Sequence, residues 1–368
     1  MKKLVATFVA LMASLALVAS AQASNESAVV KTTATPRSGS FYQSYPVPAN
    51  LVIDAQVNVP AGTPTILPLK KSKVTFPSQV SFHPNPKMPV CTESKLNEQS
   101  ALGSPSEILA DCKQSVVGTG TATLNLFKNT SAPLDDPILI MFNAGTSSSG
   151  NAKIKIYGFS KGTGVGILMR GEVKGGVLSV AVPVLSYDSA TSVYQFNLPG
   201  DGKDTALNRP EIGVVAKGLD PNYVKATCPS SGKLVTNGVL TLGERDPATG
   251  ADTGPETDVK SPTETQSCTG MAGKAKLSGK AKGPSKVKNG AKGTFKVTIK
   301  NNGTAVAKSV KVTAAGGKAS AGNIPAKGST TVKVKAKVKG KKGKKVTVKF
   351  TIKGKGVSAK ATAKVKVK

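Results

Sequence analysis

The sequence predicts an all-β protein in two parts, a β-sandwich (or barrel-like) body with one short helix and a smaller lysine-rich β module after it. Three observations carry this prediction. Short runs in which every second residue is apolar recur along the chain, and a strand turns successive side chains to opposite faces. Clusters of Gly, Pro, Asn and Asp separate these runs, as turns do. The charge divides the chain, because 28 lysines and no acidic residue lie in 271–368, out of a net charge of +31 for all 368 residues.

The first residues have the composition of a secretory signal. A positively charged start, a short apolar stretch and a small-x-small site predict a signal peptide over 1–23, cleaved before Ser24. The rest of the chain contains no second long apolar run, so we expect a secreted or cell-surface protein with no transmembrane segment in its mature chain. Residues 24–44 are rich in Ser, Thr, Ala and Pro without periodicity, and are expected to be a flexible lead-in.

The body is expected over 45–270. Its predicted strands are short runs of alternating or continuous apolar residues at Leu51–Val59, Val74–Phe76, Thr121–Phe127, Ile138–Phe142, Ala152–Phe159, Val177–Leu185, Val193–Leu198 and Ile212–Lys217. The Asn237-Gly238 pair predicts a hairpin, because both residue types adopt the positive φ that a two-residue turn needs. Ser104 to Glu107 forms a capping box with proline at the first helical position, which predicts one short helix running to Cys112.

Four cysteines lie in the body, and the module contains none. An even number of cysteines in an exported chain predicts disulfide bonds. Three pairings are possible, and we prefer Cys91–Cys112 with Cys228–Cys268 because these pairs close the shortest loops. Each bond would stabilise the body by about 3–4 kcal/mol on the loop-entropy model. No two cysteines lie two to four residues apart, which excludes a zinc ribbon.

Catalytic motifs are missing from the sequence, which favours a non-enzymatic protein. The single histidine, His83, lies in a proline-rich turn, and no Ser or Cys stands in a nucleophile motif that it would serve as general base. The run from Gly162 to Gly166 lacks the last glycine of a dinucleotide-binding loop and is typical of a turn. We expect no catalytic residue and no cofactor.

The densest acidic stretch of the sequence runs from Glu244 to Glu264. Carboxylates at this density are able to hold calcium, with Asp246, Asp252 and Asp258 as weak candidate ligands. Their spacing matches no EF-hand or repeat pattern, so we prefer a solvated surface loop.

Residues 271–287 are expected to be a Lys/Gly linker before a folded module at 288–368, and a first edge strand within this segment is the alternative. In Thr331–Lys339 and Val346–Lys353, apolar residues alternate with Lys or Thr, so each strand offers an apolar face to a core and a lysine-bearing face to water. We expect folding to gather the ammonium groups on one common side, where a polyanion binds. The predicted polyanion-binding lysines are Lys296, Lys300, Lys333, Lys335, Lys337, Lys339, Lys349, Lys353, Lys364, Lys366 and Lys368.

The order of motifs in the module resembles a known family. Lys288–Val312 is a predicted strand, an Asn-Asn-Gly turn and a second strand, and Asn323–Val332 enters a further strand through a turn. This pattern resembles the CARDB-type (cell-adhesion-related) and DUF11-like bacterial surface domains. The resemblance implies a seven-stranded immunoglobulin-like sandwich of a kind found on exported, multi-domain proteins, used as spacers or adhesion units. The module departs from the family in its complete lack of acidic residues.

The chemistry of the module limits what it is able to recognise. It has no arginine, and its two aromatic residues, Phe295 and Phe350, lie in the apolar phase of their strands, so we expect no reading of nucleic-acid sequence. Lysine is a point charge with little geometric selectivity, so binding should be non-specific and salt-dependent. The expected partners are anionic cell-envelope polymers, anionic lipid surfaces, acidic glycans or extracellular DNA.

Three functions stay open on the sequence alone. We prefer an exported cell-surface or matrix protein whose basic module docks on anionic surface polymers in an adhesion-type role. The second is a structural or spacer protein with no ligand. The third is a body that binds a glycan or calcium, with the basic module as a tether.

Overall fold

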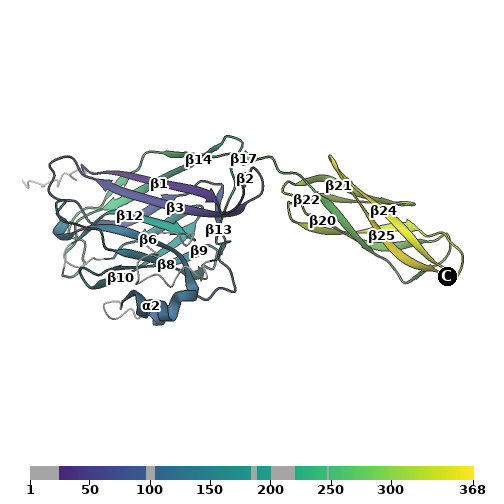
Figure 1. Cartoon of the computed structure of the whole chain (residues 1–368), viewed down its shortest axis with the longest axis horizontal. Helices are drawn as coiled ribbons and strands as arrows, with labels where there is room; N and C mark the ends of the chain where they lie inside the picture. The colour runs from purple at the N-terminus through teal and green to yellow at the C-terminus, as the bar shows by residue number, and fades with distance from the viewer. Residues whose placement is uncertain (1–24, 97–103, 184–188, 200–219, 247) are drawn as a thin grey trace, which may run out of the picture.

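The computed structural model describes residues 25–96, 104–183, 189–199, 220–246 and 248–368, and it confirms the all-β fold class (Figure 1). The predicted signal peptide over 1–23 and the predicted strand Ile212–Lys217 lie outside the described residues. Among the helices that the structure describes, none is both long and apolar enough to cross a membrane.

The first part of the chain, 25–271, is called the body here. Its strands are β1 (Ser27–Pro36), β2 (Phe41–Tyr42), β3 (Val47–Asn58), β4 (Leu69–Thr75), β5 (Val80–Phe82), β6 (Val116–Asn125), β7 (Pro133–Leu134), β8 (Ile138–Thr146), β9 (Ala152–Ser160), β10 (Val165–Lys174), β11 (Val177–Ala181), β12 (Ala190–Leu198), β13 (Val224–Ala226), β14 (Lys233–Leu242), β15 (Thr257–Lys260), β16 (Glu264–Ser267) and β17 (Gly270–Met271). Its helices are α1 (Glu93–Leu96), α2 (Pro105–Cys112) and the 3-10 turns η1 (Lys113–Ser115) and η2 (Leu126–Lys128).

One curled antiparallel sheet forms most of the body. Its strands follow the order β15-β14-β4-β11-β10-β9-β8-β6-β12-β3-β13-β5, with β1 paired to β3. The sheet curls so that β1 lies against β14, β15 and β16, which belong to the opposite end of the strand order. Here β1 forms no backbone ladder, and the hydrogen bonds that join the two ends involve side chains. The amide of Val30 donates to Ser261 Oγ at 2.8 Å, and the side chain of Gln266 exchanges two hydrogen bonds with the backbone of Ala34 at 2.7 and 2.8 Å.

Strand β8 explains how the body packs on both sides of its sheet. Leu139 and Met141 point into the core that the curled sheet encloses. The alternate residues Ile138, Ile140 and Phe142 point outward and pack on a second cluster with helix α2. A strand covered on both faces is apolar at every position, which is why this run shows no alternation in the sequence.

The predicted flexible lead-in over 24–44 is wrong. Strand β1 pairs with β3 through all ten of its residues, and its alternate residues are buried. Its inward positions include Thr32 and Ala34 beside Val30, so the inward face is only weakly apolar in the sequence. The ladder to β3 and the contacts to the far end of the sheet order hold this strand in place. The body therefore begins near Ser27 and not at residue 45.

The predicted hairpin at Asn237-Gly238 is also wrong, because β14 runs straight through both residues. They pair with β4, opposite Thr75 and Val74. Gly238 is required by close packing: a Cβ there would lie 2.7 Å from Val30 and 2.8 Å from the carbonyl of Lys73. The glycine thus allows a close approach of β1 and does not form a turn.

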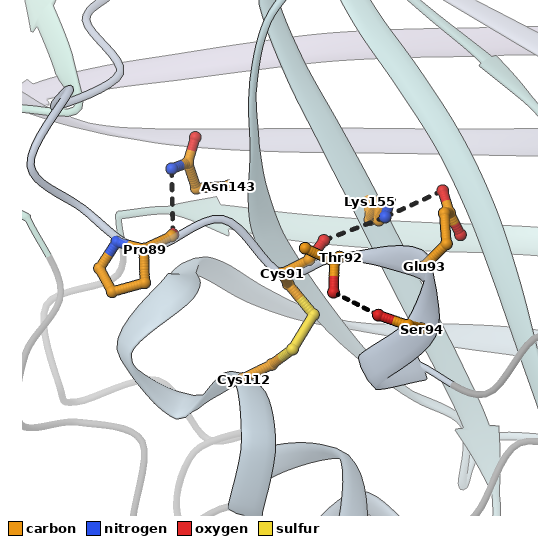
Figure 2. Close-up of a disulfide and its surroundings, with 8 residues drawn as sticks. All are labelled: Pro89, Cys91, Thr92, Glu93, Ser94, Cys112, Asn143 and Lys155. Atoms are coloured by element: carbon orange, nitrogen blue, oxygen red, sulfur yellow. Dashed lines mark hydrogen bonds and ion pairs between the residues drawn. A yellow bond between two sulfur atoms is a disulfide. The ribbon is translucent and has the colours of Figure 1, made fainter.

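The cysteine pairing and the helix follow the predictions. Cys91 bonds to Cys112 and Cys228 bonds to Cys268, and both bonds are in the structure. Helix α2 begins at Pro105 behind the Ser104–Glu107 capping box and ends at Cys112. Figure 2 shows how the first disulfide joins the end of α2 to the segment that enters α1, a further helix of one turn that the sequence did not predict.

The second part of the chain, 274–368, is called the basic module, and all of its residues are described. Its strands are β18 (Leu277–Lys282), β19 (Lys286–Val287), β20 (Lys292–Asn301), β21 (Ala307–Ala314), β22 (Gly317–Ile324), β23 (Ser329–Lys337), β24 (Lys345–Gly354) and β25 (Val357–Val367). Seven of them have six residues or more, as the immunoglobulin-like prediction requires, and β19 is a two-residue addition. They form a three-stranded sheet, β18-β20-β23, packed on a five-stranded sheet, β19-β25-β24-β21-β22.

The linker predicted over 271–287 is wrong, whereas the alternative of a first edge strand is confirmed by β18, which lies at the edge of the three-stranded sheet. Gly270 and Met271 pair with β2 of the body, and the Lys274 carbonyl already accepts a hydrogen bond from the amide of Thr304 at 2.9 Å inside the module. Strand β18 then pairs with β20 along its whole length. Lysine and glycine are frequent in this segment, but Leu277 enters the core and the lysines face water, so its composition resembles a linker while its periodicity is that of a strand.

Candidate polyanion-binding faces and polar sites of the body

The outer side of the sheet β18-β20-β23 carries lysines without acidic neighbours; we call it the three-strand face. Alternate residues of β20 are buried, which turns its lysines outward. In the middle of the face Lys282, Lys296 and Lys333 stand directly opposite one another across the three strands. Neighbouring strands lie about 4.8 Å apart, so these ammonium groups are concentrated in one row. The exposed lysines of this face are Lys280, Lys282, Lys292, Lys296, Lys300, Lys333, Lys335 and Lys337.

The outer side of the other sheet, the five-strand face, is built in the same way. Lys286, Lys366 and Lys345 form a row across β19, β25 and β24. Lys311 of β21 stands opposite Lys353 of β24. The exposed lysines of this face are Lys286, Lys311, Lys318, Lys345, Lys349, Lys353, Lys360, Lys364 and Lys366.

The structure does not bring the predicted polyanion-binding lysines onto one common side. Lys296, Lys300, Lys333, Lys335 and Lys337 lie on the three-strand face. Lys349, Lys353, Lys364 and Lys366 lie on the five-strand face, and Lys339 and Lys368 follow the ends of β23 and β25. The two sheets of a sandwich turn their outer faces in opposite directions, so the expectation of a single charged side is wrong.

Sequence reasoning also missed lysines that share these faces. Lys280 and Lys282 lie in the segment predicted as a linker or first edge strand and were not among the predicted binding lysines, although Leu277, Gly279 and Ala281 alternate with them and turn toward the core side of β18. The period-2 pattern was therefore sufficient to find them.

The acidic stretch of the body is bound to basic side chains of neighbouring strands and loops. Its carboxylates pair at 2.8 to 3.7 Å as Glu244 with Lys128, Asp252 with Lys70 and Arg245, and Glu256 with Lys71. Lys70 is buried and Asp252 is exposed. The pair lowers the pKa of Asp252, chiefly through the hydrogen bond from Lys70.

The three weak calcium candidates do not converge. Asp252 is engaged by Lys70, Asp258 accepts a hydrogen bond from Thr241 Oγ1 at 2.6 Å, and Asp246 accepts hydrogen bonds from the backbone of its own turn. In the described ranges of the chain no three His, Cys, Asp or Glu side chains are grouped as metal ligands.

His83 lies just after β5 and contacts one hydroxyl. Its Nε2 is 2.9 Å from Ser81 Oγ, which also contacts the Lys225 carbonyl at 3.3 Å. Burial lowers the pKa of His83, and the nearby charge of Lys225 lowers it further. A histidine that serves as general base is oriented and stabilised by a carboxylate, whereas the charged neighbour acting on His83 is a cation.

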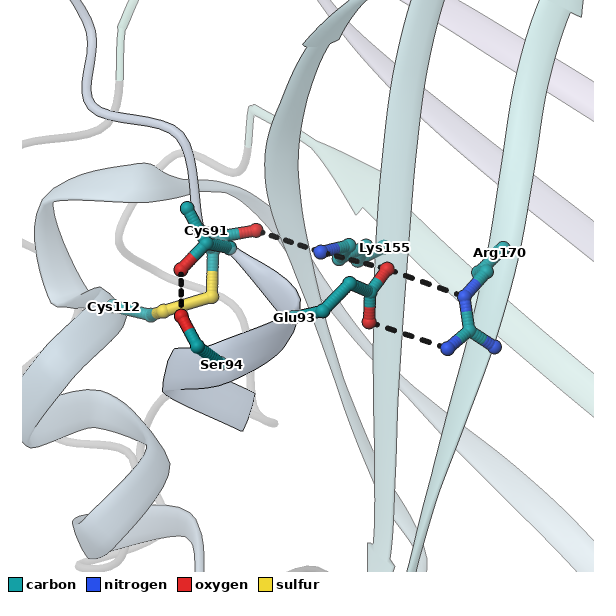
Figure 3. A network of polar contacts seen from close by, with 7 residues as sticks. Cys91, Glu93, Ser94, Cys112, Lys155 and Arg170 are labelled. Carbon is teal, nitrogen blue, oxygen red and sulfur yellow. Dashed lines mark hydrogen bonds and ion pairs between the residues drawn. A yellow bond between two sulfur atoms is a disulfide. The ribbon is translucent and has the colours of Figure 1, made fainter. Parts of the chain in front are cut away.

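Charged side chains of β9 and β10 bind the segment around the Cys91–Cys112 disulfide to the sheet (Figure 3). Lys155 of β9 is nearly buried, donates to the Cys91 carbonyl at 3.0 Å and pairs with Glu93 at 2.9 Å. Arg170 of β10 reaches both oxygens of the same carboxylate at 3.2 Å. Burial alone would raise the pKa of Glu93, but the hydrogen bonds and charges of Lys155 and Arg170 outweigh it, and the pKa is lowered. The network is a structural clamp.

The described part of the body also contains a partly open apolar cavity of about 70 Å³, lined by strands from β3 to β12. Its few polar groups are already satisfied, as in the hydrogen bond between Ser72 Oγ and Tyr194 Oη at 2.5 Å. A cavity of about 150 Å³ is known to take up benzene, so this one is too small for a ligand of that size.

The comparisons with known proteins give neither a family nor a curated relative, because no family model and no curated protein matches the chain. Among solved structures, the chain is similar to red sea bream transglutaminase at 7% identity and a TM-score of 0.21, over 92% of this chain and 31% of the other. It is similar to the T6 backbone pilin of serotype M6 Streptococcus pyogenes at 8% identity and a TM-score of 0.22, over 89% of this chain and 48% of the pilin.

A third similarity is to the CupB6 tip adhesin from Pseudomonas aeruginosa, at 10% identity and a TM-score of 0.16, over 93% of this chain and 98% of the adhesin. The chain thus spans 31% of the length of the transglutaminase and 48% of that of the pilin. At these identities and TM-scores the likeness carries no argument about function.

Proposed function

We propose that the protein is exported and non-enzymatic, and that its basic module binds anionic polymers through both of its lysine faces. One observation carries the proposal: eight exposed lysines on the three-strand face and nine on the five-strand face, with no acidic residue after Glu264. A rigid flat surface touches only one face of a sandwich. Two charged faces suit a polymer network that surrounds the module, such as an anionic cell-envelope polymer or an acidic glycan.

Two further observations support export and a role outside the cell. The body holds two disulfide bonds, which persist in oxidising compartments, and the sequence begins with a predicted signal peptide. The resemblance of the module to CARDB-type domains is in keeping with an adhesion-type role at the cell surface. The alternative in which the body binds calcium is not adopted, since the acidic stretch is already paired with Lys70, Lys71 and Lys128.

The test is retention of the chain without residues 1–23 on a polyphosphate resin, measured over a salt titration. One variant changes lysines of the three-strand face to Gln, and a second changes lysines of the five-strand face. The first set is Lys282, Lys296, Lys300, Lys333 and Lys335; the second is Lys349, Lys353, Lys360, Lys364 and Lys366. A matched control changes exposed lysines of the body, Lys31, Lys73, Lys113, Lys153 and Lys174, to Gln.

The dependence of binding on salt measures the number of anionic groups that the protein contacts. We expect each single-face variant to lose about a third of the salt dependence, the combined variant to lose somewhat more than half of it, and the body control to match the parent. Loss of all retention in one single-face variant would support docking on one side instead. A parent chain that leaves the resin at physiological salt would support the spacer function.

A further inference from the structure

Strand β24 has a partner along its whole length on one edge but only along its last residues on the other. Residues Lys345–Gly354 pair with β25 throughout. Pairing with β21 covers only Thr351–Lys353, opposite Lys311–Thr313. Within 274–368, where every residue is described, the first half of β24 thus pairs with no strand on its β21 side. An unpaired edge beside a paired one is a template for another strand.

This edge is left open because the end of β21 and the turn after it, 315–316, lie against β23 of the other sheet. The carbonyl of Ala315 accepts a hydrogen bond from the amide of Lys337, in β23, at 2.7 Å. Gly317 lies so close to β23 that a Cβ there would be 1.6 Å from the carbonyl oxygen of Lys335, so no other residue fits. The divergence opens a cleft between β24 and the end of β23.

The backbone of β24 turns hydrogen-bonding groups into this cleft. Alternate residues of a strand direct their N–H and C=O to opposite edges. On the β21 side, the amide of Lys355 donates to the Lys308 carbonyl at 3.0 Å. On the same side, the carbonyl of Thr351 accepts a hydrogen bond from Thr313 Oγ1 of β21 at 3.5 Å. Thr347 and Lys349 have the same parity as these two residues, so their N–H and C=O face the cleft.

The side chains of the cleft combine positive charge with an apolar surface. Its volume is about 580 Å³. Lys337, Lys339 and Lys349 are exposed around it, while Val338 and Val348 line it and are buried. A strand turns alternate side chains to opposite faces, so a strand with acidic residues on one face and apolar residues on the other matches both features.

We propose that this cleft binds an extended acidic peptide segment of a partner protein, which adds to β24 as a strand. The peptide exchanges backbone hydrogen bonds with Thr347 and Lys349 and sets its carboxylates against the lysines. A phosphate or sugar polymer lacks the regular N–H and C=O groups that such pairing needs. The inference therefore does not rest on the function proposed above, which concerns the outer faces.

The first test uses a probe peptide of alternating Glu and Val, capped at both ends and fluorescently labelled, with the full chain lacking residues 1–23. Strand addition uses the N–H groups of one parity only. One version of the peptide is N-methylated on its Glu residues and another on its Val residues. We expect one version to bind like the parent peptide and the other to lose binding. Equal binding by all three peptides would overturn the proposal, because attraction between charges does not depend on N–H groups.

The second test locates the peptide by residue-resolved amide hydrogen exchange. Peptide binding should protect the amides of Thr347 and Lys349. The amide of Val348 already faces β25, so its exchange should stay unchanged. Protection spread evenly over both lysine faces, without a gain at these two amides, would contradict strand addition.

Charge variants provide the third test. Changing Lys337, Lys339 and Lys349 to Glu should weaken the peptide at least about tenfold, since like charges across an interface repel. The control makes the same change at Lys274, Lys276 and Lys288, which lie outside the cleft, and should leave peptide affinity near that of the parent chain. Equal losses of peptide affinity in both variants would contradict a site confined to the cleft. Thermal melting of each variant verifies that the module is folded.

Discussion

Asn301 holds the turn after β20 with one buried side chain. Its Nδ2 donates to three backbone carbonyls and its Oδ1 accepts from two backbone amides, at 2.8 to 3.2 Å; the partners are Ala305, Ile324, Pro325, Lys276 and Gly303. These partners belong to the segment before β18, the turn after β20, and the end of β22 with the turn that follows it. An asparagine at this position is therefore explained by geometry, because one amide group satisfies three chain segments at once.

Asn301→Ala should destabilise the basic module by about 3 kcal/mol, because buried backbone groups lose their partners. The measurement is urea unfolding of the full chain, followed at the transition of the module. Asn302→Ala is the matched control, since that side chain makes a hydrogen bond to Ser278 on the exposed side and should cost less than about 1 kcal/mol. Equal losses in the two variants would show that burial of the amide is not what stabilises the turn.

At the scale of strands, the sequence predicted elements whose inward residues are strongly apolar and missed those whose inward residues are small or polar. Runs such as Ile138–Phe142 and Ala152–Phe159 fall in strands β8 and β9. Strand β1 was missed because Ala28, Thr32 and Ala34 fill inward positions. Strand β10 was missed although its core-facing residues are apolar, because Gly166 and Gly171 interrupt its run and Gly166 belongs to the stretch predicted as a turn.

Local turn signals failed where tertiary packing overrode them. Asn237-Gly238 has the composition of a hairpin, but the closeness of Val30 requires a glycine in an extended strand. The capping box at Ser104 did predict its helix, because it acts through hydrogen bonds between residues three positions apart. A signal carried by neighbouring residues is visible in the sequence, whereas contact with a strand two hundred residues away is not.

The clamp of Glu93, Lys155 and Arg170 gives a pH-dependent prediction for the α1 segment. The pKa of Glu93 is lowered on folding, so its contribution to stability is present above the ordinary pKa of 4.5 and is lost as the pH falls through the folded value. Glu93→Gln should destabilise the body by about 1 kcal/mol at neutral pH, a modest figure because the carboxylate is partly exposed to solvent.

The measurement is the Tm of the body for the parent and Glu93→Gln chains from pH 7 down to pH 3. The difference should shrink with acidity, because the parent then carries a protonated Glu93. Asp111→Asn, at an exposed acid of α2, is the control and should give no such trend. A difference that stays constant across this range would show that the charge of Glu93 is not what holds the segment.

At the scale of the whole molecule, the sequence predicted a separate basic module and the pairing of the cysteines, but it did not predict on which face of the module each lysine lies. The period-2 pattern separates inward from outward residues in each strand. It does not say which sheet a strand joins, and that assignment decides whether two lysines share a face. Lys335 and Lys349 are alike in sequence context, yet they lie on opposite sides of the sandwich.

The same distribution makes the two parts of the molecule respond differently to salt. The module carries rows of lysines such as Lys282, Lys296 and Lys333, with no acidic residue in 274–368 to offset their repulsion. The screening length falls from about 30 Å at 0.01 M salt to about 3 Å at 1 M. We therefore expect the Tm of the module to rise over this range and the Tm of the nearly neutral body to change little.

Calorimetry of the full chain at several salt concentrations is the measurement, and a thiol reductant assigns the transitions, because all four cysteines lie in the body. Reduction should lower the body transition alone. The variant with Gln at the lysines of the three-strand face should melt higher than the parent at low salt and approach it at high salt, since it lacks the repulsion that salt screens. A module Tm that changed neither with salt nor with these substitutions would show that repulsion between the lysines does not destabilise the module. A bound polyanion would then gain no affinity from reducing that repulsion.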